Sequence, residues 1–419
     1  MPLKTYYYLA QMWRNPWKPY REIEKLQLKN LKAVVTHAYE NSPFYHEKYK
    51  KAGLHPGDIN SLKDILKVPL TTKEELREAG NNVLARDISP RDHCYMTTSG
   101  SSGEKLDVIH SRDFRAVAHA FFTRIYLMWG LKPFKKMTYI RYEPLNLSLL
   151  ERLGILKVRY ISTFLDMESQ FDLLLKQDPH ILVGHPPDLI DMARLALSRG
   201  ITLNLDIVGS NSEVLTLKER EFLEKAFHCP VYEEYSAVEV SYIAQNCKKK
   251  RMHIISDAVI LEVLKEGEPA APGEKGEVVV TSLFKNATPF IRYSLGDVTS
   301  FSQDECDCGM NFPVIDGIEG RKDDFIVLPS GKEIPPTRIV PLFFNLNFMK
   351  DFTAVQTSPK KVIINIVPCK TFCERDREYL LQLVRKELTG MDIEIKCVEA
   401  LEKTAYGKKS AVINLVTKK

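Results

Sequence analysis

The sequence predicts an α/β protein with a large N-terminal domain of layered, mostly parallel sheets and a small α+β domain at the C-terminal end. Short β-branched apolar runs alternate with amphipathic helical patterns through the middle of the chain, as is typical of a mostly parallel sheet. After Asp323 the alternation changes to a βαββαβ-like pattern. The 419 residues, 44% of them hydrophobic, suffice for one large and one smaller domain. We therefore place the domains at residues 1–322 and 323–419.

Within the N-terminal domain, proline and glycine mark the ends of the predicted helices. A helical pattern at 23–35 ends before Asn41-Ser42-Pro43, and Thr71-Thr72-Lys73-Glu74 has the form of a helix N-cap. An amphipathic helix is predicted over 112–130, ending at Gly130. The remaining elements expected in this domain are strands at 181–184, 205–209 and 277–281 and helices at 188–198 and 216–227.

In the C-terminal domain, four apolar runs surround one helical pattern. The strands are expected at 354–355, 362–367, 393–398 and 412–416, and the helix at 373–387. A segment of this length is enough for a separate small domain.

Composition and charge favour an ordinary globular protein. The net charge is only +5, and the basic cluster Lys248-Lys249-Lys250-Arg251 has no aromatic residues within it, so we expect a solvated loop and no nucleic-acid partner. No apolar run is long enough to cross a membrane and no secretory signal is recognisable, so we expect a cytoplasmic protein. The eight cysteines are unevenly spread, which leaves reduced thiols or a metal site.

Residues Tyr95 to Lys105 form a hydroxyl- and glycine-rich loop, and the apolar run that follows predicts that it joins two strands. Gly100 and Gly103 allow the backbone to approach a ligand closely, while hydroxyl and N–H groups can surround phosphate oxygens. The spacing is not that of the NTPase P-loop. An ordinary Ser/Gly-rich turn is the alternative. The candidate phosphate-binding residues are Thr98, Ser99, Gly100, Ser101, Ser102, Gly103 and Lys105.

The sequence TTSGSSGEK in this loop resembles the phosphate-binding loop of the adenylate-forming ligases. Asn41-Ser42-Pro43-Phe44-Tyr45, followed by Pro69 to Arg77, is similar to the opening of the phenylacetate–CoA ligases, and Ser162 to Pro187 is similar to CapK-type proteins of polysaccharide biosynthesis. The region of the phenylacetate pocket differs here, at Met137 to Leu145. Within it, Arg141 is a candidate partner for a second acid group of a polar substrate, or else forms a surface ion pair.

The resemblance implies nucleotide-binding roles for several residues in the middle of the chain. Tyr235 would flank adenine, and Glu239 would bind Mg²⁺, a hard cation that prefers oxygen ligands. For Ser212 and Glu213 the alternative is an ordinary polar loop in which Ser212 caps the next helix. The full set expected at the nucleotide is Ser212, Glu213, Glu234, Tyr235 and Ser236.

Three further motifs complete the resemblance, which covers residues 41–408. The segment Phe290 to Asp297 contains a sequence, beginning at Arg292, that is similar to the R-Y-x-x-G-D motif of the family. In this motif Asp297 would accept hydrogen bonds from both ribose hydroxyls. In GRKDDFI, Arg321 would meet ribose or phosphate, and Asp323 would be the pivot of a mobile C-terminal domain. Near the end, Lys408, in preference to Lys409, would contact the carboxylate and the α-phosphate during adenylation.

The family resemblance implies an AMP-forming carboxylate ligase that uses ATP and Mg²⁺ and releases pyrophosphate. The acceptor of the acyl group would be CoA, or an amine or hydroxyl of a cell-surface precursor. The alternatives are a nucleotidyl transferase that leaves AMP on its product, and a non-catalytic nucleotide-binding protein. The sequence is compatible with a monomer or a homodimer.

Two cysteine-containing segments suggest a structural zinc site. Cys306-Asp307-Cys308-Gly309 is a C-x-C turn, and Cys247 and His253 form a C-x₅-H pair upstream. Three thiolates and one imidazole suit a closed tetrahedral Zn²⁺ site, with no position left for a catalytic water. The alternative is four reduced, partly buried residues without a metal.

Overall fold

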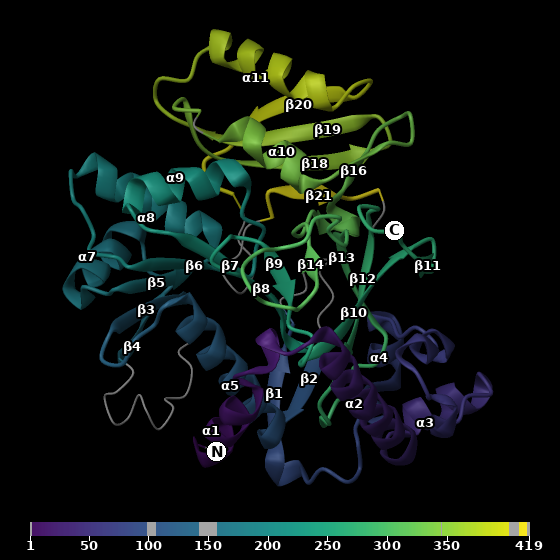
Figure 1. The fold of residues 1–419 in the computed structure, drawn as a ribbon. Helices are drawn as coiled ribbons and strands as arrows, with labels where there is room; N and C mark the ends of the chain where they lie inside the picture. The colour runs from purple at the N-terminus through teal and green to yellow at the C-terminus, as the bar shows by residue number, and fades with distance from the viewer. Residues whose placement is uncertain (1, 99–105, 142–156, 345, 402–409, 417–419) are drawn as a thin grey trace.

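The computed structural model describes residues 2–98, 106–141, 157–344, 346–401 and 410–416. Two large sheets form the N-terminal part, and a smaller sheet with two helices lies above them (Figure 1). The α/β class with a separate C-terminal unit is thus confirmed. Within the described residues, no helix has the length and apolar composition needed to span a bilayer.

The first large sheet has eight strands, in the order β14-β9-β8-β7-β6-β5-β3-β4. The strands β4, β3, β5, β6 and β7 are parallel to one another, whereas β8, β9 and β14 continue the sheet after β7 in antiparallel fashion. The parallel strands are β3 (Lys136–Arg141), β4 (Lys157–Ser162), β5 (Ile181–Gly184), β6 (Ile207–Ser210) and β7 (Val231–Ala237). The others are β8 (Ser241–Asn246), β9 (Met252–Ile254) and β14 (Val314–Ile315).

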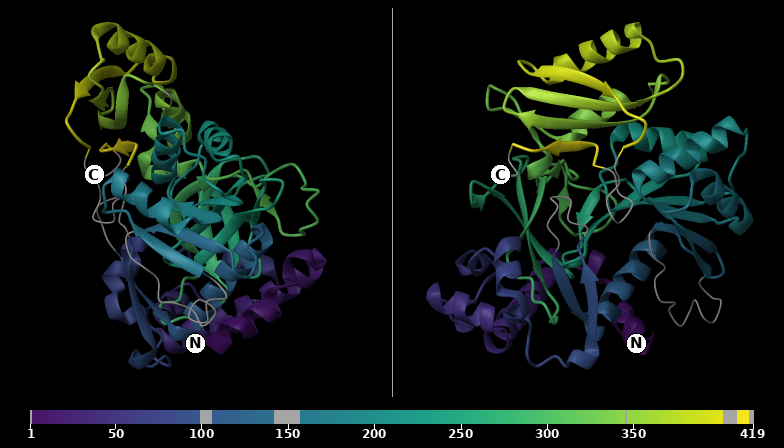
Figure 2. Two further views of the ribbon diagram at one scale, coloured as in Figure 1. Left: turned by 90° about the vertical axis from the view of Figure 1, so that its left-hand side faces the viewer. Right: turned by 180° about the vertical axis from the view of Figure 1, so that it is seen from behind.

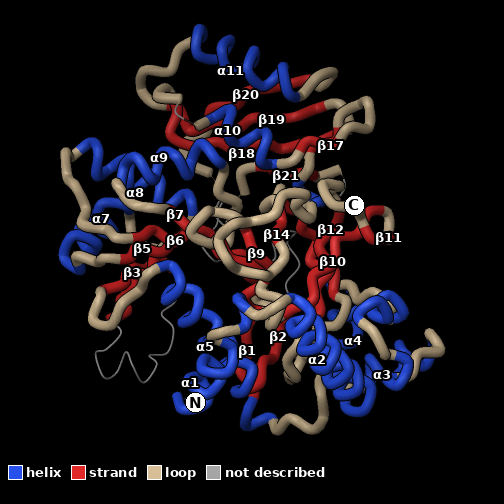
Figure 3. Tube along the Cα trace, viewed as in Figure 1, coloured by secondary structure: helices blue, strands red, loops and turns tan. Residues whose placement is uncertain are grey.

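Helices connect the parallel strands, as the alternating pattern predicts. They are α7 (Met167–Gln177), α8 (Pro186–Ser198) and α9 (Leu217–Phe227), and Figure 3 shows them gathered on the side of the molecule that carries β3 to β6. Helix α9 begins at Thr216, whose side chain accepts from the Glu219 N–H in a capping box. Ser212 is therefore not the cap of this helix.

The second large sheet is antiparallel throughout, in the order β11-β10-β12-β13-β15. Its strands are β10 (Val259–Lys265), β11 (Glu268–Pro269), β12 (Gly276–Ser282), β13 (Tyr293–Thr299) and β15 (Gly320–Arg321). A hairpin of β1 (His93–Thr97) and β2 (Asp107–Ser111) lies beside it, with Thr97 opposite Asp107. The loop was predicted at 95–105, but residues 95–97 belong to β1, so that part of the prediction is wrong. The segment that follows does lie between two strands, and residues 99–105 are outside the described residues.

The N-terminal helices are α1 (Pro2–Met12), α2 (Tyr20–Asn41), α3 (Pro43–Lys51), α4 (Lys73–Ala79) and α5 (Arg112–Trp129). Ser42 separates α2 from α3, and Thr72 caps α4 by accepting from the Glu75 N–H, so both expected boundaries are confirmed. Helix α5 ends at Gly130, whose φ of 121° is one that residues with a side chain rarely adopt. Single 3₁₀ turns lie at 15–17, 56–58, 62–67, 80–83, 90–92 and 322–324.

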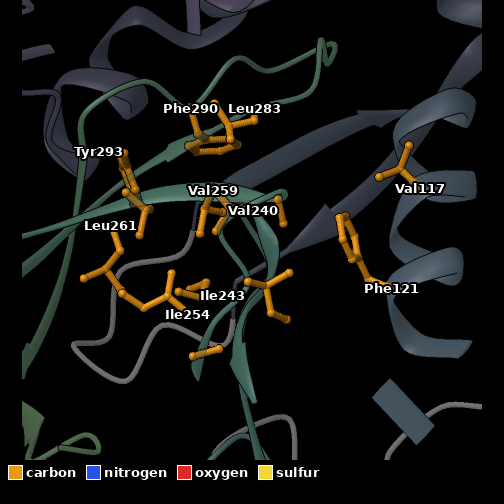
Figure 4. Packing of buried hydrophobic residues seen from close by; sticks show 14 of the residues in the cluster. Val117, Phe121, Val240, Ile243, Ile254, Val259, Leu261, Leu283, Phe290 and Tyr293 are labelled. Atoms are coloured by element: carbon orange, nitrogen blue, oxygen red, sulfur yellow. The ribbon is translucent and has the colours of Figure 1, made fainter. Parts of the chain in front are cut away.

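The main core lies where the two sheets and α5 meet. Figure 4 shows Val117 and Phe121 of α5 on one side and Val240, Ile243, Val259 and Phe290 on the other. All of these side chains are buried, and they belong to one continuous apolar cluster. Burial of apolar surface at this junction fixes the two sheets relative to each other.

The C-terminal unit has a core of its own, which runs from Ile326 to Val412. A four-stranded sheet, β20-β19-β18-β21, is covered by α10 (Pro336–Phe343) and α11 (Glu374–Glu387). Its strands are β18 (Met349–Ser358), β19 (Lys361–Pro368), β20 (Asp392–Cys397) and β21 (Val412–Asn414), and a small pair, β16 (Ile326–Val327) and β17 (Glu333–Ile334), precedes them. All four predicted strands and the predicted helix are present.

This unit rests on the larger part through a few contacts, and Figure 2 shows it at the same end of the molecule in both further views. The Phe344 ring meets Phe222 of α9 with ring centroids 5.5 Å apart, and Thr337 Oγ1 donates to Glu319 at 2.8 Å. The area between the two parts is therefore partly aromatic and partly polar.

A buried ion pair joins the N-terminal segment, α5 and the turn before β10. Arg124 donates from Nη1 and Nη2 to the two carboxylate oxygens of Asp257, at 2.6 and 2.9 Å, and their side chains are 1% and 0% exposed. Arg124 Nη1 also donates to the Met12 carbonyl, and Asn15 Nδ2 donates to Asp257, both at 2.8 Å. The pair is bidentate, which is the strongest geometry for these two groups.

We expect Asp257→Ala to destabilise the N-terminal part by about 3–5 kcal/mol, because it leaves the Arg124 charge buried without its partner. The matched control is Glu274→Ala, which removes an exposed ion pair with Lys265 and should cost less than about 1 kcal/mol. Denaturant unfolding of both variants gives the comparison. Equal shifts in the two midpoints would contradict this role for Asp257.

Candidate functional site

A cavity of about 1510 Å³ opens between the N-terminal part and the C-terminal unit. It lies at the carboxyl ends of the parallel strands, which is where open α/β sheets bind ligands. Residues from β1, β7 and β13 line it from below, and Pro336 of α10 and Val412 of β21 line it from the C-terminal unit. The expected site residues found along its wall are Thr98, Ser212, Glu213, Glu234, Tyr235, Ser236, Glu239, Asp297 and Arg321.

Three polar side chains from three strands meet at one side of this cavity. The Tyr235 hydroxyl on β7 donates to Asp297 Oδ2 on β13 at 2.6 Å. Arg321 on β15 lies opposite Asp297 in the strand register, and its Nε is 3.8 Å from Asp297 Oδ1. Burial disfavours the charged form of Arg321, but the carboxylates of Asp297 and Glu239 outweigh this and raise its pKa.

Asp297 reaches this position through an irregularity in β13. Val298 pairs with Glu277, whereas the next pair joins Ser294 to Val279, so β13 carries extra residues between these points. Gly296 sits in this bulge with a φ of 75°. The sequence motif therefore codes for a bulge that turns the carboxylate into the cavity.

Glu239 lies beside the group formed by Tyr235, Asp297 and Arg321, and it is only 8% exposed. Its Oε1 accepts from the Tyr293 hydroxyl at 3.3 Å, and burial raises the pKa of its carboxyl group. A bound cation would offset the cost of this buried charge. One carboxylate at the edge of a polar cavity suits Mg²⁺, which is usually held by one or two carboxylates together with phosphates and water.

The ends of β1 and β6 provide backbone on the opposite side. Thr98 continues the hairpin, donating its N–H to the Leu106 carbonyl at 3.0 Å and accepting at Oγ1 from the Leu106 N–H at 2.9 Å. Ser212, after β6, has a φ of 66°, which is uncommon for a residue with a side chain. Such conformations gather at functional sites.

Glu234 is on the other face of β7 from Tyr235, since successive side chains of a strand alternate. Its Oε1 accepts from Asn211 Nδ2 at 3.2 Å, and Asn211 Nδ2 also donates to the Tyr139 hydroxyl. Within the described residues, Oε2 of Glu234 has no hydrogen bond of normal geometry, although the Tyr126 hydroxyl is close enough to interact with this carboxyl group. Burial raises the pKa of Glu234 to about 7.

Other groups around Glu234 were not expected from the sequence. Tyr126 of α5, Tyr139 of β3 and Tyr242 of β8 surround it, and burial, followed by the Glu234 charge, raises the pKa of all three hydroxyls. Arg141 lines the same cavity, with its guanidinium carbon 5.3 Å from the centre of the Tyr139 ring. The three tyrosines come from separate elements, so no local motif identified them, whereas the sequence did single out Arg141 as a candidate partner for an acid group of the substrate.

Some expected residues lie elsewhere. Arg292 is 6% exposed and donates to Glu262 and to the Val68 carbonyl, at 2.9–3.1 Å, so it links the start of β13 to β10 and to the segment before α4. Asp323 lies in the turn between β15 and the C-terminal unit. The remaining expected residues, Ser99, Gly100, Ser101, Ser102, Gly103, Lys105 and Lys408, are outside the described residues.

The two cysteine-containing segments come together at the far edge of the eight-stranded sheet. The potential ligand atoms of Cys247, His253, Cys306 and Cys308 all lie within 4.8 Å of one another. Cys247 Sγ is 3.7 Å from Cys306 Sγ, and Cys308 Sγ is 3.3 Å from His253 Nε2. His253 Nδ1 is 2.7 Å from the Phe312 carbonyl, which leaves Nε2 to face the thiols. The predicted grouping is thus present in the fold, whereas the metal itself stays a prediction.

Known proteins resemble this chain over most of its length. Residues 326–415 match the CapK C-terminal domain. The chain is 26% identical over 339 residues to phenylacetate-coenzyme A ligase of Thermus thermophilus, covering 77% of this chain and 75% of that protein. It is 24% identical over 427 residues to protein CapK of Staphylococcus aureus, covering 94% and 89% of the two chains.

A solved structure of 2-hydroxyisobutyryl-CoA ligase in the postadenylation state matches with a TM-score of 0.82 at 23% identity, covering 96% of this chain and 91% of that one. The same enzyme in the thioesterification state matches with a TM-score of 0.66. The fold is therefore that of the adenylate-forming ligases. Within this class the chain is a relative of the phenylacetate–CoA ligases and of CapK, as the motifs predicted.

We expect Glu234→Gln to stabilise the free protein more at pH 8 than at pH 5. Between the ordinary value of 4.5 and about 7, the folded state keeps a proton on Glu234 that the unfolded chain has released, so stability falls as the pH rises through this window. Glutamine does not ionise, so the variant avoids this loss, which is about 1–3 kcal/mol. Unfolding midpoints of both proteins at the two pH values provide the measurement.

The charged groups around Glu234 do not obscure this effect. The neighbouring tyrosines have raised pKa values and stay protonated over this range. Glu233→Gln, one residue earlier on β7, is a matched control, because Arg220 holds that carboxylate in an ion pair. A stability difference for Glu234→Gln that does not change with pH would contradict a buried, titrating carboxyl group.

Proposed function

We propose that this chain is an ATP- and Mg²⁺-dependent ligase that adenylates a carboxylic acid, releases pyrophosphate and then transfers the acyl group to a nucleophile. The observation that carries this proposal is the group formed by Tyr235, Asp297 and Arg321 beside the buried Glu239. The four residues line one cavity at the carboxyl ends of the strands. The relationship to phenylacetate–CoA ligases gives the same reaction class.

In this proposal each residue of the group meets one part of ATP. The two oxygens of Asp297 accept the two ribose hydroxyls, and the Tyr235 hydroxyl, which donates to Asp297, keeps the carboxylate in place. The Tyr235 ring flanks adenine. Arg321, charged and next to Asp297, meets a ribose or phosphate oxygen.

Glu239 would hold Mg²⁺, since it is a buried carboxylate that lines the cavity and accepts from Tyr293. When bound, Mg²⁺ offsets the negative charge of the phosphate oxygens. The loop at 98–105 would surround the phosphates with hydroxyl and N–H groups. Lys408 would supply a positive charge where the acid carboxylate attacks the α-phosphorus and the bond to pyrophosphate breaks.

We propose that the C-terminal unit, from Asp323 onward, takes up two poses. The larger TM-score to the postadenylation state of 2-hydroxyisobutyryl-CoA ligase than to its thioesterification state supports a pose related to the former. The contacts between Phe344 and Phe222 and between Thr337 and Glu319 would break in the other pose. The turn at Lys322–Asp324 is short and lies between the two cores, as a hinge requires.

The acceptor in this proposal is CoA, and an amine or hydroxyl of a cell-surface precursor is the second candidate. Relationship to the CoA ligases favours the first, while the CapK C-terminal domain and the similarity to CapK along the chain favour the second. We propose a cytoplasmic location, where ATP is available and cysteines stay reduced. Analysis of the product for a thioester, an ester or amide, or retained AMP distinguishes ligase from transferase.

The proposal predicts ATP–pyrophosphate exchange that depends on an added carboxylic acid. Lys408→Ala should lower the exchange by about a hundredfold or more while transfer from a preformed acyl-adenylate persists, because the amine acts only where charge grows on the α-phosphate. The matched control is Lys409→Ala, which should exchange normally. Wild-type rates in both half-reactions for Lys408→Ala would contradict the assignment.

In the same two assays, Asp323→Pro should block one half-reaction by restricting the hinge.

We also propose that Cys247, His253, Cys306 and Cys308 hold a structural zinc ion. Four ligand atoms within 4.8 Å of one another fit a tetrahedral site with ligands at about 2.0–2.3 Å. The Phe312 carbonyl orients the imidazole. The ion would tie the turn at 306–309 to β8 and β9 of the main sheet.

Protein purified without added metal should contain close to one zinc per chain by elemental analysis. Cys308→Ser should lose most of the metal and unfold at a lower temperature, because structural zinc contributes directly to folding. Cys229→Ser is a suitable control, since that buried cysteine lies in a different core cluster and should keep the metal. Metal-free wild-type protein with the same unfolding temperature as zinc-loaded protein would contradict the site.

A further inference from the structure

We propose that the acid carries a hydrogen-bond donor, a hydroxyl or an amino group, in its acyl part, and that Glu234 accepts from it. This inference rests on the proposed ligase function. It concerns the part of the cavity on the far side of β7 from the nucleotide residues.

The position follows from strand geometry. Tyr235 and Glu234 are adjacent on β7, so their side chains leave the sheet on opposite faces. Tyr235 turns to Asp297, whereas Glu234 turns to Asn211 and the tyrosines of α5, β3 and β8. Both residues line the same cavity. A molecule bound to the Tyr235 face can therefore extend into the part of the cavity that contains Glu234.

The weak pairing of Glu234 contrasts with that of two other acids of low exposure among the described residues, Asp257 and Glu262. Asp257 and Glu262 are each held by a bidentate arginine. Glu234 is 5% exposed and accepts one hydrogen bond of normal geometry, from Asn211. The Tyr126 hydroxyl is close enough to lower the pKa of the carboxyl group as a weak second donor, but neither this hydroxyl nor Oε2 has a hydrogen bond of normal geometry among the described residues. An unsatisfied buried acceptor costs stability, so its presence at a cavity wall points to a ligand donor.

The surrounding side chains limit what the donor is attached to. Phe122, Tyr139 and Tyr242 line this part of the cavity, and Phe122 packs on Tyr126 with ring centroids 4.6 Å apart. These rings favour an apolar or aromatic acyl skeleton. The one strongly polar acceptor among them then selects for a hydroxyl or amino group on that skeleton. An acid without a donor would bury Oε2 with no compensation, and such sites discriminate strongly against the analogue.

Adenine is the competing source of a donor, because its exocyclic amine would also suit a carboxylate. If Glu234 accepted from adenine, its loss would raise the KM for ATP with every acid. If it accepts from the acid, the KM for ATP stays near that of wild type and the preference among acids changes. The two explanations therefore give different kinetic results.

The experiment compares pairs of acids that differ only in the donor. Suitable pairs are 4-hydroxybenzoate with 4-methylbenzoate, 3-aminobenzoate with 3-methylbenzoate, and 3-hydroxybutyrate with 3-methylbutyrate. ATP–pyrophosphate exchange is measured at pH 8, above the pKa of about 7 of Glu234, so that the ionised carboxylate can only accept. The proteins compared are wild type, Glu234→Leu and the control Glu233→Gln. We expect the donor-bearing acid to exceed its partner by at least about tenfold in kcat/KM in one or more pairs. This ratio should fall toward one or invert in Glu234→Leu and persist in Glu233→Gln.

A thermal-shift assay with each acid and a non-hydrolysable ATP analogue provides a second readout that does not need turnover. The donor-bearing acids should raise the unfolding temperature of wild type more than their partners do, and Glu234→Leu should lose this difference. Equal responses to both members of every pair, or a raised KM for ATP in Glu234→Leu, would overturn the inference. Absence of exchange with all acids, together with a donor-dependent thermal shift, would instead count against the proposed reaction and leave the acid preference supported.

Discussion

The buried pair between Arg124 and Asp257 is the interaction on which the N-terminal part depends most. It joins α5, which packs against both large sheets, to the turn that leads into β10, and the same guanidinium holds the Met12 carbonyl. Two charges with almost no exposure are tolerated only because each has several hydrogen-bond partners. The relative position of the two sheets, and hence of the cavity between their ends, follows from this junction.

The segment that carries the Cys/His cluster (Cys247, His253, Cys306 and Cys308) also contacts the N-terminal residues 16–18. Asn311, just after the C-x-C turn, donates its N–H to the Pro16 carbonyl at 2.7 Å and its amide to the Trp17 and Lys18 carbonyls at 3.2 and 3.0 Å. Ile23 of α2 packs in one small core with Cys247 and Phe312. Residues 12–23 are therefore fixed at two points, one ionic and one built on the cluster, and they hold the edge of the eight-stranded sheet.

The sequence predicted what is local and missed what is assembled from distant elements. Strand–helix alternation located β5, α8 and α9, and the motif around Asp297 singled out a residue that the structure places at the cavity, although the bulge at Gly296 was not predicted. The antiparallel second sheet was not foreseen, because apolar strands of either orientation look alike in sequence. Arg292 shares a motif with Asp297 and yet serves packing. The residues around Glu234 could not be predicted from the sequence, because Tyr126, Tyr139 and Tyr242 lie on separate elements and become neighbours only after folding.

Strand β7 places two successive residues in two different chemical environments. A substitution at Glu234 changes the face toward α5 and β3, while Tyr235 keeps its bond to Asp297 on the other face. Under the proposed function, selection on acid preference can therefore proceed by single substitutions at Glu234 that leave the contact between Tyr235 and Asp297 in place. Insertion or deletion of one residue in β7 would exchange the two faces and disturb both at once. Divergence among relatives with this fold should thus favour replacement over changes of length in this strand.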